Sequence, residues 1–262
     1  IRVRLTEVGA MMRVQCPISK LIVGTECGAS DAFSGITANP LIGAVVDRVI
    51  SGGGGAILSE VPEMFGAEHL LMERMRDKNV IDKFRQIILW YKKIAESLGV
   101  DMRHNLVPEN IAGGLINPCI KSLGAITKGG TGPIEGVLEY GEPINSSGLH
   151  IMQGPGNDME SITGMVASGA NIICFSTGKG TVTGGALVPV VKVASNTELY
   201  SKMSDDMDFN GGRLVEEGAL CHDDIVDQLF NKVISVASGE SSKSELNGQK
   251  QFQVWTAGKL SL

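Results

Sequence analysis

Short apolar runs alternate with longer amphipathic stretches along this chain. Five of the runs have the length and the continuous apolar character of strands that are buried on both faces. They lie at residues 21–25, 56–60, 149–153, 171–177 and 188–194. Elsewhere, apolar residues recur every three or four positions, as they do on one face of a helix. The helices expected from this spacing span residues 39–51, 67–98 (one broken helix or two consecutive ones), 117–128, 159–168, 196–203 and 223–238.

Strands that alternate with helices predict an α/β fold. We expect a mostly parallel, doubly wound, Rossmann-like sheet with helices on both faces. Residues 1–239 are expected to form a single α/β domain, and the polar residues 240–262 an extended tail. The chain starts at Ile1 without an initiator Met, so we interpret it as the C-terminal fragment of a longer protein.

Composition argues against several classes of function. The net charge is −6 and there is no long basic run, which disfavours a nucleic-acid partner or an anionic membrane surface. No apolar run approaches the ~18 residues of a membrane span. The cysteines are scattered and odd in number, so we expect no disulfide framework and a cytoplasmic location. Four glycines at 52–55 precede a strand, whereas a dinucleotide fingerprint follows one, so no nucleotide cofactor is expected.

The loop after the first expected strand, residues 26–40, is rich in functional groups. It holds carboxylates, a thiol, hydroxyls and an amide, far more than a turn needs to reverse the chain. In parallel sheets, ligands bind at the carboxyl ends of the strands. Other expected strands end at Ser59-Glu60, at residues 177–180 and at Ser195. We therefore expect a polar site where these ends meet residues 26–40.

Several segments, in one order along nearly the whole chain, resemble the carboxy-terminal part of the altronate and galactarate dehydratase family. This family also includes the large subunit of sulfolactate sulfo-lyase. The matching segments are Glu-Cys-Gly-Ala-Ser-Asp-Ala-Phe-Ser-Gly-Ile-Thr-Ala-Asn-Pro at 26–40, Ala-Ile-Leu-Ser-Glu-Val-Pro-Glu at 56–63, Gly-Ala-Glu-His-Leu-Leu at 66–71, Lys-Ser-Leu-Gly-Ala-Ile-Thr-Lys-Gly-Gly at 121–130, Phe-Ser-Thr-Gly-Lys-Gly at 175–180, Met-Asp-Phe-Asn-Gly-Gly at 207–212 and Ser-Lys-Ser-Glu-Leu-Asn-Gly at 242–248.

The resemblance implies a hydro-lyase that dehydrates a sugar acid such as altronate or galactarate to a 2-keto-3-deoxy acid through a metal-stabilised enolate. It further implies a divalent metal, Fe²⁺ or Mn²⁺, and an amino-terminal domain or subunit absent from this chain. The chain departs from the family pattern at Ala29 and Lys179, where the pattern has Gly and Arg. Lys keeps the charge of Arg but loses its bidentate grip on a carboxylate, which leaves the substrate's identity open.

Four residues are our catalytic candidates: Cys27, Asp31, Glu60 and Lys128. Cys27 and Glu60 follow strands expected to be neighbours, so they are also our candidate metal ligands. A small buried core residue is the alternative for Cys27, and a solvated strand end or helix cap for Glu60. Lys121 and Lys128 lie seven residues apart, on one face of a helix, and either is a candidate base if its surroundings lower its pKa, although solvated lysines are commoner.

Substrate-binding candidates come from three loops that combine hydroxyls, amides, glycines and one ammonium group. Ser and Thr are also frequent helix caps, which is the alternative reading for any one of them. The Thr-Gly-Lys-Gly loop is expected to wrap a carboxylate with backbone N–H groups and one ammonium. The candidates are Ser30, Ser34, Thr37, Asn110, Gly113, Gly114, Thr177, Gly178, Lys179 and Gly180.

The sequence thus favours a dehydratase and leaves rival functions open. One is a non-catalytic domain that binds a sugar acid or a partner subunit. Another is a carbon–sulfur lyase of the sulfolactate type, and a nucleotide-dependent oxidoreductase is disfavoured by the position of the glycines. A small hydroxy acid is the expected ligand, and assembly into a homo-oligomer is left open.

Overall fold

The computed structural model describes residues 4, 6–7, 10–102, 106–217, 222–256 and 261. Over these residues, seven strands form one sheet in the order β3-β4-β2-β1-β5-β6-β7, and every neighbouring pair is parallel. The strands are β1 (Ile22–Gly28), β2 (Gly55–Leu58), β3 (Ile134–Leu138), β4 (Gly148–Met152), β5 (Ile172–Thr177), β6 (Val190–Ala194) and β7 (Phe209–Asn210). The predicted parallel α/β sheet is confirmed.

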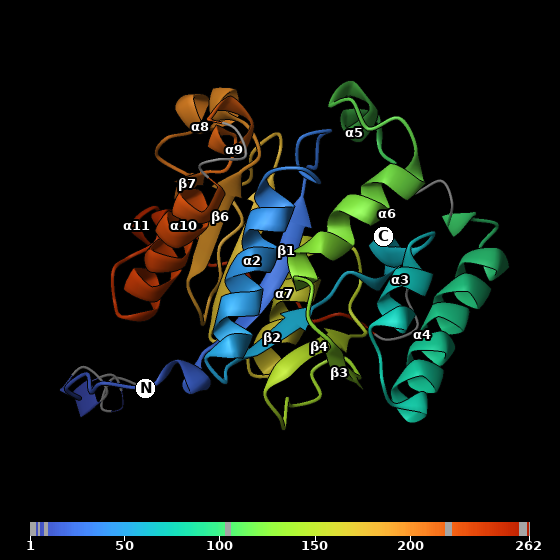
Figure 1. Cartoon of the computed structure of the whole chain (residues 1–262), viewed down its shortest axis with the longest axis horizontal. Coiled ribbons are helices and arrows are strands. Elements are labelled where there is room, and N and C mark those ends of the chain that lie inside the picture. The colour runs from blue at the N-terminus through green and yellow to red at the C-terminus, as the bar shows by residue number, and fades with distance from the viewer. Residues whose placement is uncertain are drawn as a thin grey trace.

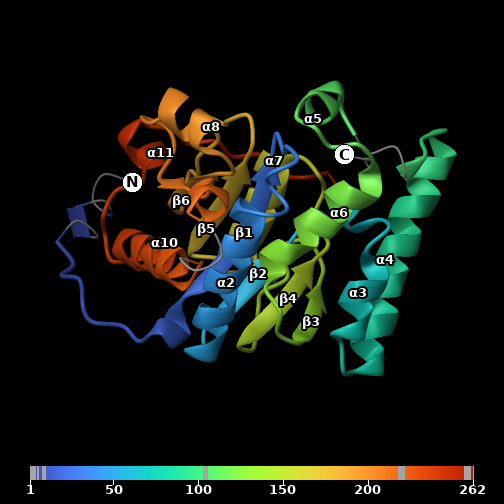
Figure 2. The same ribbon diagram turned by 45° about the horizontal axis from the view of Figure 1, so that its top comes forward.

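Helices cover both faces of this sheet. Figure 1 shows α2 (Ala38–Ser51) in front of β1 and α7 (Asp158–Ala167) behind the sheet. Figure 2 shows α10 (His222–Ala237) beside α2 on the same face. The remaining helical segments are η1 (Ile18–Lys20), η2 (Val61–Met64), α3 (Glu68–Glu73), α4 (Lys78–Ser97), α5 (Pro108–Ala112), α6 (Pro118–Ile126), η4 (Thr127–Gly129), α8 (Thr197–Lys202), α9 (Arg213–Glu216) and α11 (Lys243–Leu246).

Two apolar clusters fill the spaces between the helices and the sheet. The larger joins α2, α4 and α10 to one face, and the smaller joins α7 to the other. Strand β1 lies in the middle of the sheet, and six of its seven residues are buried. The carboxyl end of β1 is therefore enclosed on both sides, and the polar residues that follow it lie deep in the molecule.

A close contact between α2 and the turn η4 fixes the position of Lys128, which lies in that turn. A Cβ atom built at Gly43 would lie 2.1 Å from the carbonyl oxygen of Thr127, so only glycine permits this approach. Arg74 holds the other side of the turn by donating to the carbonyl oxygens of Gly129 and Gly132. These contacts fix the backbone on either side of Lys128.

Two strands and one helix are among the elements that the sequence pattern does not predict. Strand β3 is short and contains Gly136, and β7 has only two residues. The connection expected to be polar and irregular contains helix α5, whose first residue is Pro108. Proline suits that position because its missing N–H has no partner in the first helical turn.

The expected extended tail is a further difference, in the described part of residues 240–262. Helix α11 begins there with a capping box formed by Ser242 and Glu245. Ser244 donates to the carbonyl oxygen of Val190, and Trp255 is buried in the larger apolar cluster. This segment packs against the sheet, although its composition is polar. Residues 257–260 and 262 lie outside the described residues.

Among the described helices, none combines the length and the apolar character needed to cross a lipid bilayer.

Candidate functional site

A thiol and a carboxylate meet at the carboxyl end of the central strand. The backbone N–H of Cys27 donates to Oε2 of Glu60 over 3.0 Å, and the Cys27 sulfur lies 3.7 Å from Glu60 Oε1. Both side chains are buried. The sequence-based expectation that these two residues face each other from neighbouring strands is confirmed.

The backbone at Glu60 is strained. Its φ and ψ of 63° and 51° lie in the left-handed region, which residues with a side chain rarely adopt. Such a conformation costs ~1–3 kcal/mol and persists where the surrounding structure enforces it. Here it turns the chain sharply after β2, so that the Glu60 carboxylate reaches β1 instead of following the strand direction.

Glu63 and two lysines complete the inner shell around the thiol. Cys27 Sγ donates to Glu63 Oε2 over 3.1 Å, and Lys121 Nζ lies 2.8 Å from Glu63 Oε1. Lys128 Nζ donates to Cys27 Sγ over 2.7 Å and also forms a short ion pair with Glu60. Lys128 is only 1% exposed, so this ammonium is held by the acidic groups rather than by water.

Two more acidic groups lie on the other face of β1. Glu26 is buried and accepts a hydrogen bond from the Ser161 hydroxyl, whose oxygen lies 2.8 Å from that of Ser59. A Cβ atom on Gly28 would lie 2.6 Å from Asp158 Oδ2, so glycine is needed there to admit this carboxyl group. The other oxygen of Glu26 is buried without a hydrogen-bond partner. The end of β1 therefore carries acidic groups on both faces of the sheet.

Burial raises the pKa values of several of these acids. The pKa of Glu60 rises to about 7, because burial outweighs the attraction of Lys128. Burial, with the nearby Glu60 and Glu63, also raises the pKa of the Cys27 thiol well above its usual value. The pKa of Asp158 rises to about 6 through burial and the charge of Glu63. A carboxyl group with a pKa near 7 can exchange protons at neutral pH.

The two lysines are held in the charged form. Burial alone lowers the pKa of Lys128, but the acidic groups around it, above all Cys27 and Glu60, outweigh burial and raise it well above its usual value. Glu63 raises the pKa of Lys121 in the same way. The acidic groups around Lys128 raise its pKa instead of lowering it, so Lys128 does not have the environment that a base needs. It is a positively charged partner of Cys27.

A cavity of about 210 Å³ opens onto this cluster. Cys27 and Lys121 line it, together with Ser30 and Asp31. At ~30 Å³ for each water molecule, the cavity has room for about seven waters or a small organic acid. Glu60 and Lys128 do not line this cavity but lie behind Cys27, against Glu63 and the apolar residues of α6. A ligand in the cavity would thus meet the thiol and the Lys121 ammonium directly.

Asp31 belongs to a separate hydrogen-bond hub. Its Oδ1 atom accepts from the backbone N–H and the hydroxyl of Ser34 and from the hydroxyl of Ser195. Its Oδ2 atom accepts from the side-chain amide of Asn196 over 3.0 Å. This carboxylate ties the loop after β1 to the loop after β6, with both oxygens engaged. The arrangement holds the cavity wall in place.

The remaining polar candidates near residues 30–40 and 110–114 chiefly support that wall. The hydroxyl of Thr37 lies 2.7 Å from the carbonyl oxygens of both Phe33 and Ser195, so its one hydrogen is shared between them. The side chain of Asn110 donates to the carbonyl oxygen of Ser30 and accepts from the N–H of Val107. Gly113 and Gly114 pack against residues of the loop after β1, close enough that a Cβ atom would press on Asp31 and Ala32.

The loop after β5 packs against Asp31, because a Cβ atom on Gly178 would lie 2.4 Å from Asp31 Cγ. The N–H groups of Gly178 and Lys179 both donate to the carbonyl oxygen of Ala29, and that of Gly180 donates to the Thr177 hydroxyl. These bonds use the N–H groups expected to wrap a carboxylate. Lys179 is exposed, and the positive charge of Lys202, together with that of Lys179, lowers the pKa of the surface residue Glu198. Lys179 does not take part in the thiol cluster.

Comparison with known proteins connects this site to a family of lyases. Residues 18–260 match the sequence profile described as "D-galactarate/Altronate dehydratase, C-terminal". The chain belongs to this family. It is 40% identical over 247 residues to an altronate dehydratase of Bacillus subtilis, covering 94% of this chain and 49% of the relative. It is 37% identical over 236 residues to a galactarate dehydratase (L-threo-forming) of Escherichia coli, covering 90% and 45%.

A third relative has a different name. The chain is 31% identical over 246 residues to the beta subunit of (2R)-sulfolactate sulfo-lyase from Chromohalobacter salexigens, covering 92% of this chain and 63% of that subunit. The resemblance stated from the sequence motifs is therefore confirmed at the level of the family. The chain spans about half the length of the curated dehydratases it matches.

The dehydratase family implies a divalent metal, and the cluster has donors suited to one. The sulfur of Cys27 and carboxylate oxygens of Glu60 and Glu63 lie within 4.8 Å of one another, all buried. Four carboxyl groups at the end of β1 face two lysines, which leaves two acids without a matching ammonium, and one oxygen of Glu26 has no hydrogen-bond partner. Carboxylate oxygens suit Mn²⁺, and Fe²⁺ accepts both oxygen and sulfur ligands.

Sequence reasoning missed two members of the cluster in this dehydratase-family chain, Glu63 and Asp158, and named Lys121 only as a possible base. Glu63 and Lys121 both lie within matched motifs, and Asp158 is the first residue of α7. Glu63 follows Glu60 by three residues, a spacing at which side chains are neighbours on a helix, although in the structure Glu60 lies just before η2, in the left-handed region. That spacing is the signal that could have found Glu63. Nothing in the sequence pattern points to Asp158, because it looks like an ordinary acid in the first turn of a helix.

Proposed function

We propose that this chain carries the proton-transfer site of a sugar-acid dehydratase. The supporting observation is that Cys27 and Lys121 line one cavity while Glu60, Glu63 and Lys128 surround the thiol from behind. The substrate is a small hydroxy acid such as altronate or galactarate, and the product is a 2-keto-3-deoxy acid. The names of the relatives support this substrate class.

The first proposed step removes the proton on the carbon beside the substrate carboxylate. Lys121 pairs with that carboxylate, because its ammonium lies at the cavity wall. Cys27 takes the proton on its sulfur, after passing its own proton to Glu60, whose pKa of about 7 allows it to accept one at neutral pH. Lys128 stays charged, contacts both groups and stabilises the negative charge on them.

The second step expels the hydroxyl group from the neighbouring carbon. Cys27 gives the proton that it took up to the departing hydroxyl, which leaves as water, and the proton held by Glu60 then returns to the sulfur of Cys27. The resulting enol then becomes the 2-keto acid by losing the proton of its remaining hydroxyl to the site and taking up one proton from the site at the carbon that lost the hydroxyl. The site finishes with the protons it had at the start.

A divalent ion is part of this proposal. Glu63 and one oxygen of Glu60 would hold it, with the sulfur of Cys27 within reach as a third donor, and the proton of the first step would then go to the other oxygen of Glu60. When bound, the ion supplies positive charge that polarises the substrate and lowers the pKa of the neighbouring thiol.

The proposal is tested with the longest natural polypeptide that contains this sequence, purified with Mn²⁺ or with Fe²⁺ under anaerobic conditions. Altronate, galactarate and sulfolactate are supplied in turn, and both 2-oxo acid and sulfite are measured. Formation of 2-oxo acid from a sugar acid supports the proposal. Release of sulfite from sulfolactate alone replaces it with the carbon–sulfur lyase function. Binding of a sugar acid without any product replaces it with the non-catalytic binding domain.

A further inference from the structure

Apolar side chains surround the mouth of the cavity on the outside of the molecule. Six of them are between 41% and 79% exposed, and we call them the apolar rim. They are Phe33, Ile36, Ile111, Ile116, Ile120 and Leu123. Single exposed apolar residues are common on any protein, but a continuous group of this size marks a surface that contacts another molecule.

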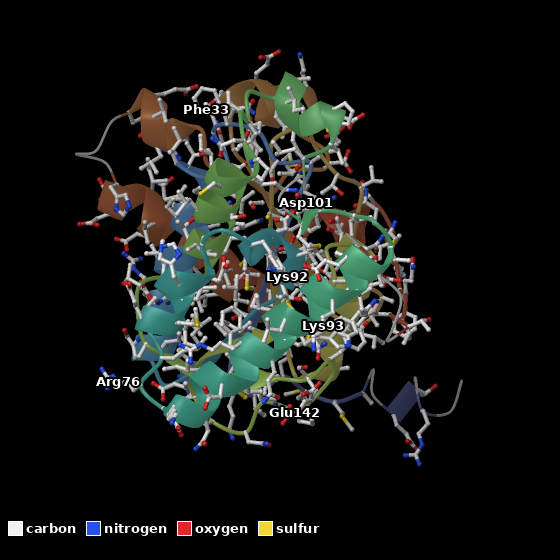
Figure 3. The ribbon with its side chains drawn as sticks, turned by 90° about the vertical axis from the view of Figure 1, so that its right-hand side faces the viewer. Phe33, Arg76, Lys92, Lys93, Asp101 and Glu142 are labelled. Atoms are coloured by element: carbon white, nitrogen blue, oxygen red, sulfur yellow. The ribbon has the colours of Figure 1, made fainter. Side chains whose placement is uncertain are left out.

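The rim is one continuous surface built from three segments. Ile36 from the loop after β1 and Ile120 and Leu123 from α6 all line the same cavity. The segment that contains Ile111 joins them, because the N–H of Ala32 donates to the carbonyl oxygen of Gly113 over 2.9 Å. Figure 1 shows α5 and α6 at the end of the molecule toward which β1 points, and Figure 3 shows Phe33 at that end.

The fold itself does not require these side chains to be apolar. Helix α6 already buries an inner face through Ala125 and Ile126, and its outer face carries Ile120 and Leu123. A helix at the surface usually has one apolar face and one polar face, and one that is apolar on both sides is covered on both sides. The outer face of α6 is therefore a contact surface that the described residues leave uncovered.

We infer that the apolar rim is the docking surface for the additional polypeptide that accompanies this region in the longer dehydratases. Three of the relatives have about twice the length that this chain matches, and their matched region is described as C-terminal. A polypeptide seated on the rim would cover the mouth of the cavity. The inference extends the proposed function, because it assigns the missing wall of the same site.

The size of the cavity favours an additional polypeptide on the apolar rim over a rim that stays open to solvent. Pockets that enclose a small ligand usually measure about 300–1,000 Å³ and bury most of the ligand's surface. The cavity here is about 210 Å³, and half-exposed side chains such as Ile36 form its outer edge. An added wall over the rim would deepen the cavity and exclude water from Cys27, which strengthens the charge interactions there.

Site-specific photo-crosslinking tests the inference. A benzoylphenylalanine residue replaces Ile116 of the rim in the longest natural polypeptide that contains this sequence. The matched control replaces Leu187, which is 74% exposed. Leu187 precedes β6, so it lies near the amino-terminal ends of the strands, whereas the cavity lies at their carboxyl ends. We expect crosslinks from position 116 to map to polypeptide outside residues 18–260, and position 187 to give none there.

Two other results would overturn the inference. Crosslinks from position 116 to residues 18–260 of a second copy would make the rim a homo-oligomer interface, and a lack of any protein crosslink would make it a free surface. A second variant, Leu123→Asp, is expected to lower the crosslink yield at position 116 about tenfold, as loss of a central contact does in protein interfaces. The readout uses no activity, so it can fail while the dehydratase proposal stands.

Discussion

The ammonium of Lys128 lies 2.7 Å from the sulfur of Cys27, although 101 residues separate them in the chain. This contact places a fixed positive charge beside the one thiol that faces the cavity among the described residues. A nearby ammonium favours the thiolate over the thiol, so it opposes the effect of burial and of the neighbouring acids. Because Lys128 contacts both Cys27 and Glu60, a proton that moves between these two groups stays beside the same positive charge.

The two fully buried cysteines offer a matched pair of substitutions. Cys27 and Cys174 lie on neighbouring strands, and each is a free thiol. We expect Cys27→Ala to lower kcat at least ~100-fold, the usual loss when a group that transfers a proton is removed. Cys174→Ala is expected to leave kcat within a few-fold, because Cys174 packs in the apolar core. Kinetics of 2-oxo acid formation and circular dichroism check both variants. Equal activity in the two variants would exclude Cys27 from the chemistry.

Metal binding separates the role of Glu63 from that of Cys27. We expect Glu63→Gln to weaken Mn²⁺ binding by at least ~10-fold, because it removes a carboxylate donor. Cys27→Ser should change the affinity much less if the sulfur chiefly transfers protons. Titration followed by electron paramagnetic resonance gives both affinities, with the exposed Glu139→Gln as the control. Unchanged affinity in Glu63→Gln would show that the ion binds elsewhere.

Asp158 predicts a pH dependence of stability in the metal-free protein. Its pKa rises from 3.8 to about 6 on folding, so between these values the folded state binds more protons than the unfolded state. Stability from this group is full below pH ~3.8 and is lost as pH rises through 6, by at most about 3 kcal/mol. Asp158→Asn should therefore gain stability over wild type as pH rises from 4 to 7. Urea unfolding with a chelator present measures it, and a difference that is constant with pH would contradict the prediction.

Two substitutions of Asp31 distinguish a structural role of its carboxylate from a catalytic one. Its two oxygens accept four hydrogen bonds, from Ser34, Ser195 and Asn196. We expect Asp31→Ala to lower the free energy of unfolding by ~2–4 kcal/mol, because buried donors lose a charged acceptor. Asp31→Asn keeps one oxygen and should lose less stability and little activity. If Asp31→Asn is stable but loses activity ~100-fold or more, the carboxylate takes part in the chemistry itself.

The sheet could be predicted from the sequence because its strands are buried on both faces. In the run at 171–177, for example, residues 172–175 are Ile-Ile-Cys-Phe, with no polar residue to obscure a parallel strand. Strand β3 could not, because Gly136 interrupts a five-residue segment and its pairing register shifts beside that glycine. The tail could not either, because its attachment depends on single contacts such as that of Ser244 with Val190, which leave no periodic pattern.

The candidate site was predictable only where local order implies spatial proximity. Cys27 and Glu60 both follow parallel strands, so topology alone brings them together. The partnership of Lys128 with Cys27 could not be derived, because it depends on the turn η4 packing against Gly43. Lys179 follows a neighbouring strand in the same way as Glu60, yet it faces solvent. A strand end thus specifies an edge of the sheet but not the direction of a long side chain.

The left-handed backbone at residue 60 has a consequence for how this sequence can change. Glycine at this position would relax the left-handed turn, because it adopts that conformation without strain. It would also remove a carboxyl group whose charged form burial disfavours. Both effects would make the folded protein more stable. Random drift under selection for folding alone would replace Glu60. Libraries that screen only for thermal robustness are therefore expected to replace Glu60, and with it the carboxylate on which the proposed proton transfer depends.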